Sequence, residues 1–244
     1  MAKGEKTFGW RVLAVVVIPF LQLVGRYRIV GSVRIPKTGA VIIAPNHVTN
    51  IDPLVTAYVV WRAGRVPRFL AKASLFRVPV VGAVLRGTGQ IPVERAGRQR
   101  EGDPLDRASG LVSDGLALLV YPEGTLTRDP DLWPMRGKTG AVRLALEYDV
   151  PIIPMAHWGA QRILPRYSKR LSLFPRKNVD VLIGEPVDLG RFRDAPRTSA
   201  MYAEATEVVM QSITVLVQEL RGEQAPTKRW DPADHGQTEF GKLP

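Results

Sequence analysis

The chain has 244 residues, 45% of them hydrophobic, with no cysteine and a formal net charge of +11. The lack of cysteine excludes disulfide frameworks, thiolate metal sites and thiol nucleophiles, and the hydrophobic content is enough for one sizeable core. The positive charge favours anionic partners. Because only 7% of the residues are aromatic, with no basic stretch interleaved with stacking rings, we expect acidic lipid or a phosphorylated ligand and no nucleic acid.

The chain begins with a basic and apolar segment. Residues 12–21 form the most apolar run, but they are too few for a bilayer-spanning helix, which needs about 20 residues. A secretory signal peptide would need a small-residue cleavage site, which residues 22–26 do not offer. Two interpretations remain: a buried first helix, or an anchor in the membrane interface, to which the six basic residues of positions 1–35 are suited.

Beyond this segment, apolar runs rich in β-branched residues alternate with helical periodicity. The alternation predicts a single α/β domain over residues 27–221, with a mixed, mostly parallel sheet covered by helices. We expect an N-terminal, membrane-associating helix within residues 1–26 and a polar tail, 222–244, that is either disordered or a surface arm. The predicted helices are 8–24, 53–62, 80–86, 104–115, 139–148 and 199–221, and the predicted strands are 27–35, 41–45, 68–72, 90–94, 117–122, 152–158 and 179–183.

One loop carries residues suited to acid–base chemistry. His47 and Asp52 follow the predicted strand 41–45, at the carboxyl end where ligands of α/β sheets gather. A carboxylate held at a helix start can orient the imidazole and stabilise its charged form, as a general base acting on an alcohol requires. The structural alternative is that Asp52 caps the helix that begins at Pro53, and that His47 is an ordinary polar loop residue.

Four segments together resemble a known family. They read NHVTNIDP at residues 46–53, GQIPVERAG at 89–97, VYPEGTLTRD at 120–129 and VPIIPMAHWGA at 150–160. In this order they are similar to the four motifs of the glycerolipid acyltransferases of the 1-acylglycerol-3-phosphate acyltransferase type, whose first motif is HX4D. The segment KTGAVRLAL at 138–146 also resembles the stretch between the last two motifs. The resemblance implies an O-acyltransferase of phospholipid biosynthesis.

The resemblance also implies a mechanism and a set of binding residues. His47 would take the proton of the acceptor hydroxyl as that oxygen attacks the thioester of acyl-CoA or acyl carrier protein, which are co-substrates, with no further cofactor. Asp52 would hold the imidazole in the correct tautomer. No acyl-enzyme is needed, which suits a chain without cysteine and without a Gly-x-Ser-x-Gly elbow. By position, the resemblance assigns the acceptor's glycerol phosphate to Arg95, Glu123, Gly124 and Thr125, and the acyl-donor side to Pro154.

One departure from the family concerns acceptor recognition. Many members have a basic residue directly after the threonine of the third motif, where this chain has Leu126. Arg128 lies two residues further and is the candidate to replace it. Lys72 and Lys138 also lie near basic positions of the family, and a cationic side chain matches a phosphate.

The expected setting is a membrane surface. The resemblance implies a peripheral or monotopic protein at the cytoplasmic face of the cell membrane, with an anionic surface and a lysophospholipid as partners; no oligomeric state is predicted. An enzyme of the same fold with another lipid acceptor, such as a glycolipid, and a non-catalytic, basic membrane-binding module are the alternatives. His157 lies on an apolar predicted strand, so we expect a core residue, and three separated histidines without cysteine argue against zinc.

Overall fold

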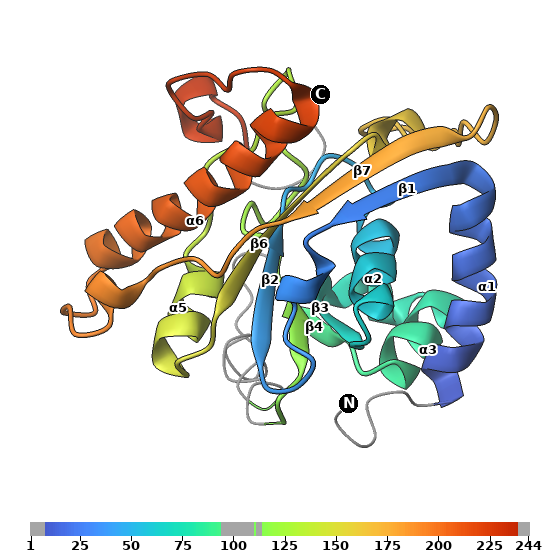
Figure 1. Cartoon of the computed structure of the whole chain (residues 1–244), viewed down its shortest axis with the longest axis horizontal. Coiled ribbons are helices and arrows are strands. Elements are labelled where there is room, and N and C mark those ends of the chain that lie inside the picture. The colour runs from blue at the N-terminus through green and yellow to red at the C-terminus, as the bar shows by residue number, and fades with distance from the viewer. Residues whose placement is uncertain (1–7, 94–109, 111–113, 239–244) are drawn as a thin grey trace.

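The computed structural model describes residues 8–93, 110 and 114–238. They form a seven-stranded sheet of order β1-β7-β6-β2-β5-β3-β4 (Figure 1). Every neighbouring pair is parallel except β6 with β7, so β1 and β7 run against the other strands. The strands are β1 (Gly25–Val30), β2 (Val41–Pro45), β3 (Pro67–Lys72), β4 (Ile91–Val93), β5 (Ala117–Leu119), β6 (Ile152–Trp158) and β7 (Lys177–Ile183).

Helices cover both faces of the sheet. Figure 1 shows α1 (Phe8–Val24), α2 (Asp52–Arg62) and α3 (Pro79–Gly87) on one side, with α5 (Gly140–Glu147) and α6 (Ser199–Arg221) on the other. A parallel sheet covered on both faces needs strands that are apolar throughout, which is why β2 is a continuous apolar run. The predicted α/β fold with a mostly parallel sheet is confirmed.

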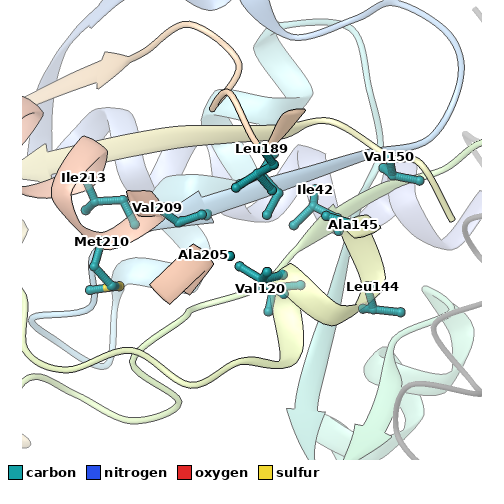
Figure 2. Packing of buried hydrophobic residues seen from close by; sticks show 14 of the residues in the cluster. Ile42, Val120, Leu144, Ala145, Val150, Leu189, Ala205, Val209, Met210 and Ile213 are labelled. Atoms are coloured by element: carbon teal, nitrogen blue, oxygen red, sulfur yellow. The ribbon is translucent and has the colours of Figure 1, made fainter. Parts of the chain in front are cut away.

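Successive residues of β2 pack into two different cores. Ile42 belongs to the cluster that includes Val209 of α6, which Figure 2 shows from close by. Its neighbour Ile43 belongs to the second cluster, with Leu21 of α1 and Val59 of α2. Side chains alternate between the faces of a strand, so β2 joins the two cores and fixes the position of the loop that follows it.

Several predicted bounds differ from the structure. The helix 8–24 has the predicted bounds, but the predicted strand 27–35 is wrong beyond Val30. Gly31 has a φ of +82°, and a Cβ there would lie 2.3 Å from the carbonyl oxygen of Ile183. The strand therefore ends at a position that requires glycine, and a 3-10 turn over Ser32–Arg34 follows. Arg95 and the predicted helix 104–115, apart from residues 110, 114 and 115, lie outside the described residues.

The described part of the polar tail, residues 222–238, is a surface arm, which is one of the two predicted alternatives. The chain reverses at Gly222, whose φ is +67°, and returns along α6. Arg136 donates its backbone N–H to the carbonyl of Trp230 at 2.9 Å, and Arg229 donates to Thr214 of α6 at 2.7 Å. We call residues 222–238 the C-terminal arm. Among the described helices, none is both long and apolar enough to cross a membrane.

Candidate active site

The predicted acid–base pair lies at the carboxyl end of β2. This strand ends at Pro45, His47 lies in the short loop that follows, and Asp52 is the first residue of α2. Parallel strands β5 and β6 flank β2, so the loops after all three strands meet at one edge of the sheet. Such an edge is where α/β proteins bind ligands.

His47 and Asp52 are in direct contact. Nδ1 of His47 lies 2.9 Å from Oδ2 of Asp52, and the same oxygen accepts the backbone N–H groups of Val48 at 2.7 Å and Thr49 at 2.8 Å. The Asp52 side chain is fully buried, whereas that of His47 is 13% exposed. A carboxylate acceptor fixes the proton on Nδ1, which leaves Nε2 able to accept a proton from a ligand.

The structure decides between the two interpretations of Asp52. The aspartate does not cap α2, because Ile51 occupies the N-cap position and α2 has no side-chain cap. Its carboxylate instead turns back to the loop, where it holds both the imidazole and two backbone N–H groups. The capping alternative is therefore wrong, and the orienting role is the one that the contacts support.

The third predicted motif holds His47 in place. The carbonyl of His47 accepts the N–H of Thr127 at 2.7 Å, and the His47 ring stacks on Tyr121 with centroids 4.1 Å apart. The Tyr121 hydroxyl bonds that of Thr56 at 2.8 Å, and burial raises the pKa of Tyr121 well above its usual value. The phenol therefore stays neutral, and the ring acts as a fixed wall for the imidazole.

Glu123, a predicted acceptor-binding residue, also accepts hydrogen bonds from the backbone of the site. Its carboxyl group is buried, with Oε1 accepting the N–H of His47 at 2.9 Å and Oε2 accepting that of Met135 at 3.0 Å. Burial raises the pKa of Glu123 to about 8, although the two backbone hydrogen bonds oppose the shift. Glu123 thus supports the backbone of His47, and it is not among the described residues that line the neighbouring cavity.

A large cavity of about 1040 Å³ opens beside His47. Its walls are mainly apolar side chains of three helices, among them Leu13 and Val17 of α1, Leu54 and Trp61 of α2, and Val81 of α3. The cavity is therefore suited to a long apolar ligand whose reacting atom lies next to the imidazole.

The basic part of the cavity lining includes two of the predicted binding residues. Lys72 and Lys138 both line the cavity with Arg143 of α5. Gly124 lines it too, with a φ of +70°, and a Cβ there would lie 3.0 Å from Cδ of Lys138. Glycine therefore allows the lysine chain to pass close to the backbone. Arg143 was missed because its spacing in an amphipathic helix indicates only a solvated position.

Three predicted residues lie away from this lining. Arg128 is only 1% exposed, and its role as the replacement for a basic residue at position 126 stays a prediction. Thr125 is 8% exposed and Pro154 lies within β6, opposite Ala44 of β2. None of the three lines the cavity among the described residues, and their sequence-based assignments stay predictions.

His157 is a core residue, as predicted, but it also lies beside the pair. Its side chain is fully buried, with Nε2 3.2 Å from the carbonyl oxygen of Asn46 and 3.6 Å from Oδ2 of Asp52. The side chain of Asn46 bonds both backbone groups of His157, at 2.9 and 3.1 Å. Burial lowers the pKa of His157, so this imidazole stays neutral. Sequence reasoning missed the contact because 111 positions separate Asn46 from His157.

These features define a class of protein. An α/β sheet presents a buried carboxylate and an oriented imidazole beside an apolar cavity with basic groups in its lining. Such a site can remove a proton from a ligand that has a long apolar part and an anionic group.

The chain belongs to the Acyltransferase family, whose model matches residues 26–158. It is 29% identical over 141 residues, or 58% of its length, to a chloroplast 1-acyl-sn-glycerol-3-phosphate acyltransferase of Brassica napus. It is 33% identical over 52% of its length to the 1-acyl-sn-glycerol-3-phosphate acyltransferase of Borreliella burgdorferi, and 29% identical over 64% to that of Haemophilus influenzae. The matches span 40%, 49% and 62% of these relatives' own lengths.

A solved structure has the same fold. The 1-acyl-sn-glycerophosphate acyltransferase PlsC from Thermotoga maritima superimposes with a TM-score of 0.61 and 23% identity, over 92% of this chain and 81% of that chain. The family-model match and the named relatives confirm, at the level of the family, the resemblance that the four motifs indicated.

Proposed function

We propose that this protein transfers a fatty acyl group from a thioester carrier to the hydroxyl of a lysophospholipid, with 1-acylglycerol-3-phosphate as the acceptor and phosphatidate as the product. The observation that carries the proposal is the contact of 2.9 Å between Nδ1 of His47 and the buried carboxylate of Asp52. The names of the relatives support the acceptor and the reaction.

The proposed reaction is a direct transfer. Nε2 of His47 takes the acceptor's hydroxyl proton while the hydroxyl oxygen attacks the thioester carbonyl. The tetrahedral intermediate then collapses, the carbon–sulfur bond breaks, and the leaving thiolate receives the proton from the imidazolium. Asp52 stabilises that imidazolium through Nδ1, and the buried setting strengthens this attraction.

The cavity supports the assignment of the two substrates. Its apolar walls suit an acyl chain, and Lys72, Lys138 and Arg143 supply positive charge for a phosphate. Arg95 of the second motif remains a proposed phosphate ligand on the strength of the family resemblance. Either acyl-CoA or acyl carrier protein can serve as the donor in this scheme.

The surface of α1 supports a place at the membrane. Val12, Val15, Val16 and Leu23 are 50%, 73%, 67% and 54% exposed, although Leu21 on the other face is fully buried. A helix that exposes several large apolar side chains on one face needs a second apolar environment for that face. The proposed location is therefore peripheral, at an anionic, cytoplasmic membrane surface.

Mass spectrometry of the products tests the proposal. The full chain is incubated with a mixture of lysolipids, including a glycolipid acceptor, and with acyl-CoA or acyl carrier protein as the donor. Phosphatidate that forms with the wild type and not with His47→Ala supports the proposal. Acylation of another lysolipid alone would favour a different acceptor, for which the buried Leu126 in place of a basic residue speaks. Membrane binding without any transfer would favour a basic binding module.

A further inference from the structure

The connection between β6 and β7 carries an unusual surface. Residues 165–177, which we call the basic loop, read PRYSKRLSLFPRK and contain five basic residues and no acidic residue. Leu171, Leu173 and Phe174 in this loop are 46%, 36% and 67% exposed. Exposed apolar side chains next to unbalanced positive charge are typical of segments that enter an anionic lipid interface.

Among the described residues, no carboxylate forms an ion pair with the two exposed cations at the centre of the loop. These two residues are Lys169 and Arg170. Many other exposed basic residues are paired, such as Arg191 with Glu204 and Arg193 with Asp149. The basic loop therefore attracts anions more strongly than these surfaces do.

The loop is fastened to the active site at its first residues. Arg166 donates Nη1 to the carbonyl oxygens of Thr127, at 2.8 Å, and Asp129, at 2.6 Å. Thr49 donates its hydroxyl to the carbonyl of Leu164, directly before the loop. The partners on the active-site side are thus Thr49, whose N–H binds Asp52, and Thr127, whose N–H binds His47. The basic loop is therefore hydrogen-bonded to the two segments that hold His47 and Asp52 in place.

The loop is also fastened to the end of α1. Arg176 donates Nη2 to the carbonyl of Gly25 at 2.9 Å, directly after the last residue of α1. Figure 1 shows the β6–β7 connection at the end of the sheet where α1 meets β1. The exposed residues Leu23 and Arg26 lie on either side of Gly25, so the apolar face of α1 and the basic loop adjoin.

We infer that the basic loop is a second membrane contact, which inserts Leu171 and Phe174 among anionic lipids and sets the active site against the bilayer. The exposed Leu171 and Phe174 favour a lipid partner over an acidic protein, because positive charge alone would be enough to bind an acidic protein. The inference rests on the proposed membrane association of α1 but not on acyl transfer, since binding can be measured without substrate.

Co-sedimentation of the full chain with vesicles tests the inference. The vesicles consist of phosphatidylcholine alone or mixed with phosphatidylglycerol. Lys169→Glu with Arg170→Glu should weaken binding to the mixed vesicles by about tenfold or more. Leu171→Ser with Phe174→Ser should weaken binding to both kinds of vesicle by about tenfold or more.

Matched control variants distinguish a specific membrane contact of the basic loop from a general effect of charge and from anchoring by α1 alone. Arg191→Glu with Arg193→Glu changes the net charge equally, at a distant turn, and should leave binding within about twofold. Equal losses in this control and in the loop variants would overturn the inference. Normal binding of the loop variants, with loss only in Val15→Ser with Val16→Ser, would overturn it while supporting α1 as the anchor. Loop variants that bind vesicles normally but turn over acyl carrier protein poorly would also overturn it, in favour of a protein-docking role. Circular dichroism confirms the fold of each variant.

Discussion

Nε2 of His157 lies 3.6 Å from Oδ2 of Asp52, and both side chains are fully buried. The same nitrogen is 3.2 Å from the carbonyl of Asn46. Both neighbours are acceptors, so the proton of the neutral imidazole belongs on Nε2. His157 thus places a donor next to the carboxylate that orients His47, and this relationship gives the first prediction.

Replacing His157 should weaken both stability and the alignment of the base. His157→Leu leaves the Asn46 carbonyl without its donor and should lower the free energy of unfolding by about 1–3 kcal/mol. His157→Gln keeps an N–H donor and should recover part of the turnover. Denaturant unfolding and kcat measure the two effects. If the two variants had equal turnover, the donor would have no positioning role.

The stability contribution of His157 should depend on pH in one direction. Burial lowers its pKa, so below the unfolded-state value of 6.5 the unfolded chain binds more protons than the native chain. Relative to His157→Gln, the wild type should therefore lose stability as the pH falls through 6.5 and lower. Thermal melts of both proteins at several pH values give the difference, and a constant difference would contradict the assignment.

Glu123 should show the opposite pH dependence. Its native pKa of about 8 lies above the unfolded value of 4.5, so the native state holds the proton more tightly. The resulting stabilisation is fully present below pH 4.5 and is lost as the pH rises toward 8, at about 1.4 kcal/mol per pH unit. Relative to Glu123→Gln, the wild type should become less stable with rising pH. Thermal melts of the wild type and Glu123→Gln at several pH values measure this stability difference, which should grow in the direction opposite to that for His157. A difference that does not change with pH would contradict the prediction.

Variants of His47 and Asp52 should differ in stability although both lose turnover. His47→Ala removes a partly exposed ring and should leave the fold intact while lowering kcat by about a hundredfold or more. Asp52→Asn should lower kcat as strongly and should also destabilise the protein, because this carboxylate accepts two backbone N–H groups. Turnover and melting temperature are measured together. Near-wild-type turnover of His47→Ala would remove the proposed base.

Lys138 should act on the acceptor more than on the donor. Lys138→Ala should raise the KM for 1-acylglycerol-3-phosphate by about tenfold, the loss of one charge-assisted hydrogen bond, and change the KM for the acyl donor little. Arg191→Ala, an exposed cation paired with Glu204, serves as the control. Equal changes in both constants would argue against a phosphate contact.

Arg221, the last residue of α6, should contribute to the stability of the protein through its contacts with two tryptophan rings. Cζ of Arg221 lies 3.8 Å from the ring centroid of Trp133 and 4.5 Å from that of Trp158. Arg221→Ala should cost about 1–3 kcal/mol of unfolding free energy, since a partly desolvated guanidinium between two indoles is lost. Lys228→Ala, in the exposed C-terminal arm, should leave the free energy of unfolding nearly unchanged. Similar losses in both would show that the stacking is unimportant.

Sequence patterns predicted most of the sheet and the His47–Asp52 pair, because these depend on local spacing. The strand before His47 is continuously apolar, and the two residues lie one loop apart. The burial of the Glu123 and Arg128 side chains depends on segments distant in the chain. Glu123 meets His47 across 76 positions, which no local pattern encodes. Motif position assigned both residues to the ligand, and that assignment stays a prediction.

The structure of the tail was also hard to predict, because it depends on contacts with segments distant in the chain. Its polar composition lacks the apolar periodicity that predicts structure. The C-terminal arm is nevertheless held by side chains of α6 and by the loop after β5, through hydrogen bonds such as that of Arg229 with Thr214. Arg143 and the basic loop were missed because their spacing resembles that of ordinary solvated surface.

The reversed direction of β1 and β7 determines at which end of the sheet the β6–β7 connection and the end of α1 lie. If β7 ran parallel to β6, residues 159–176 would have to return to the other end of the strands before β7 could pair with β6. Because the two strands are antiparallel, the chain turns at once, at the edge where His47 lies. Since β1 runs with β7, the end of α1 reaches that edge as well. One change of strand direction thus brings the end of α1, the β6–β7 connection and the His47 imidazole to the same end of the sheet.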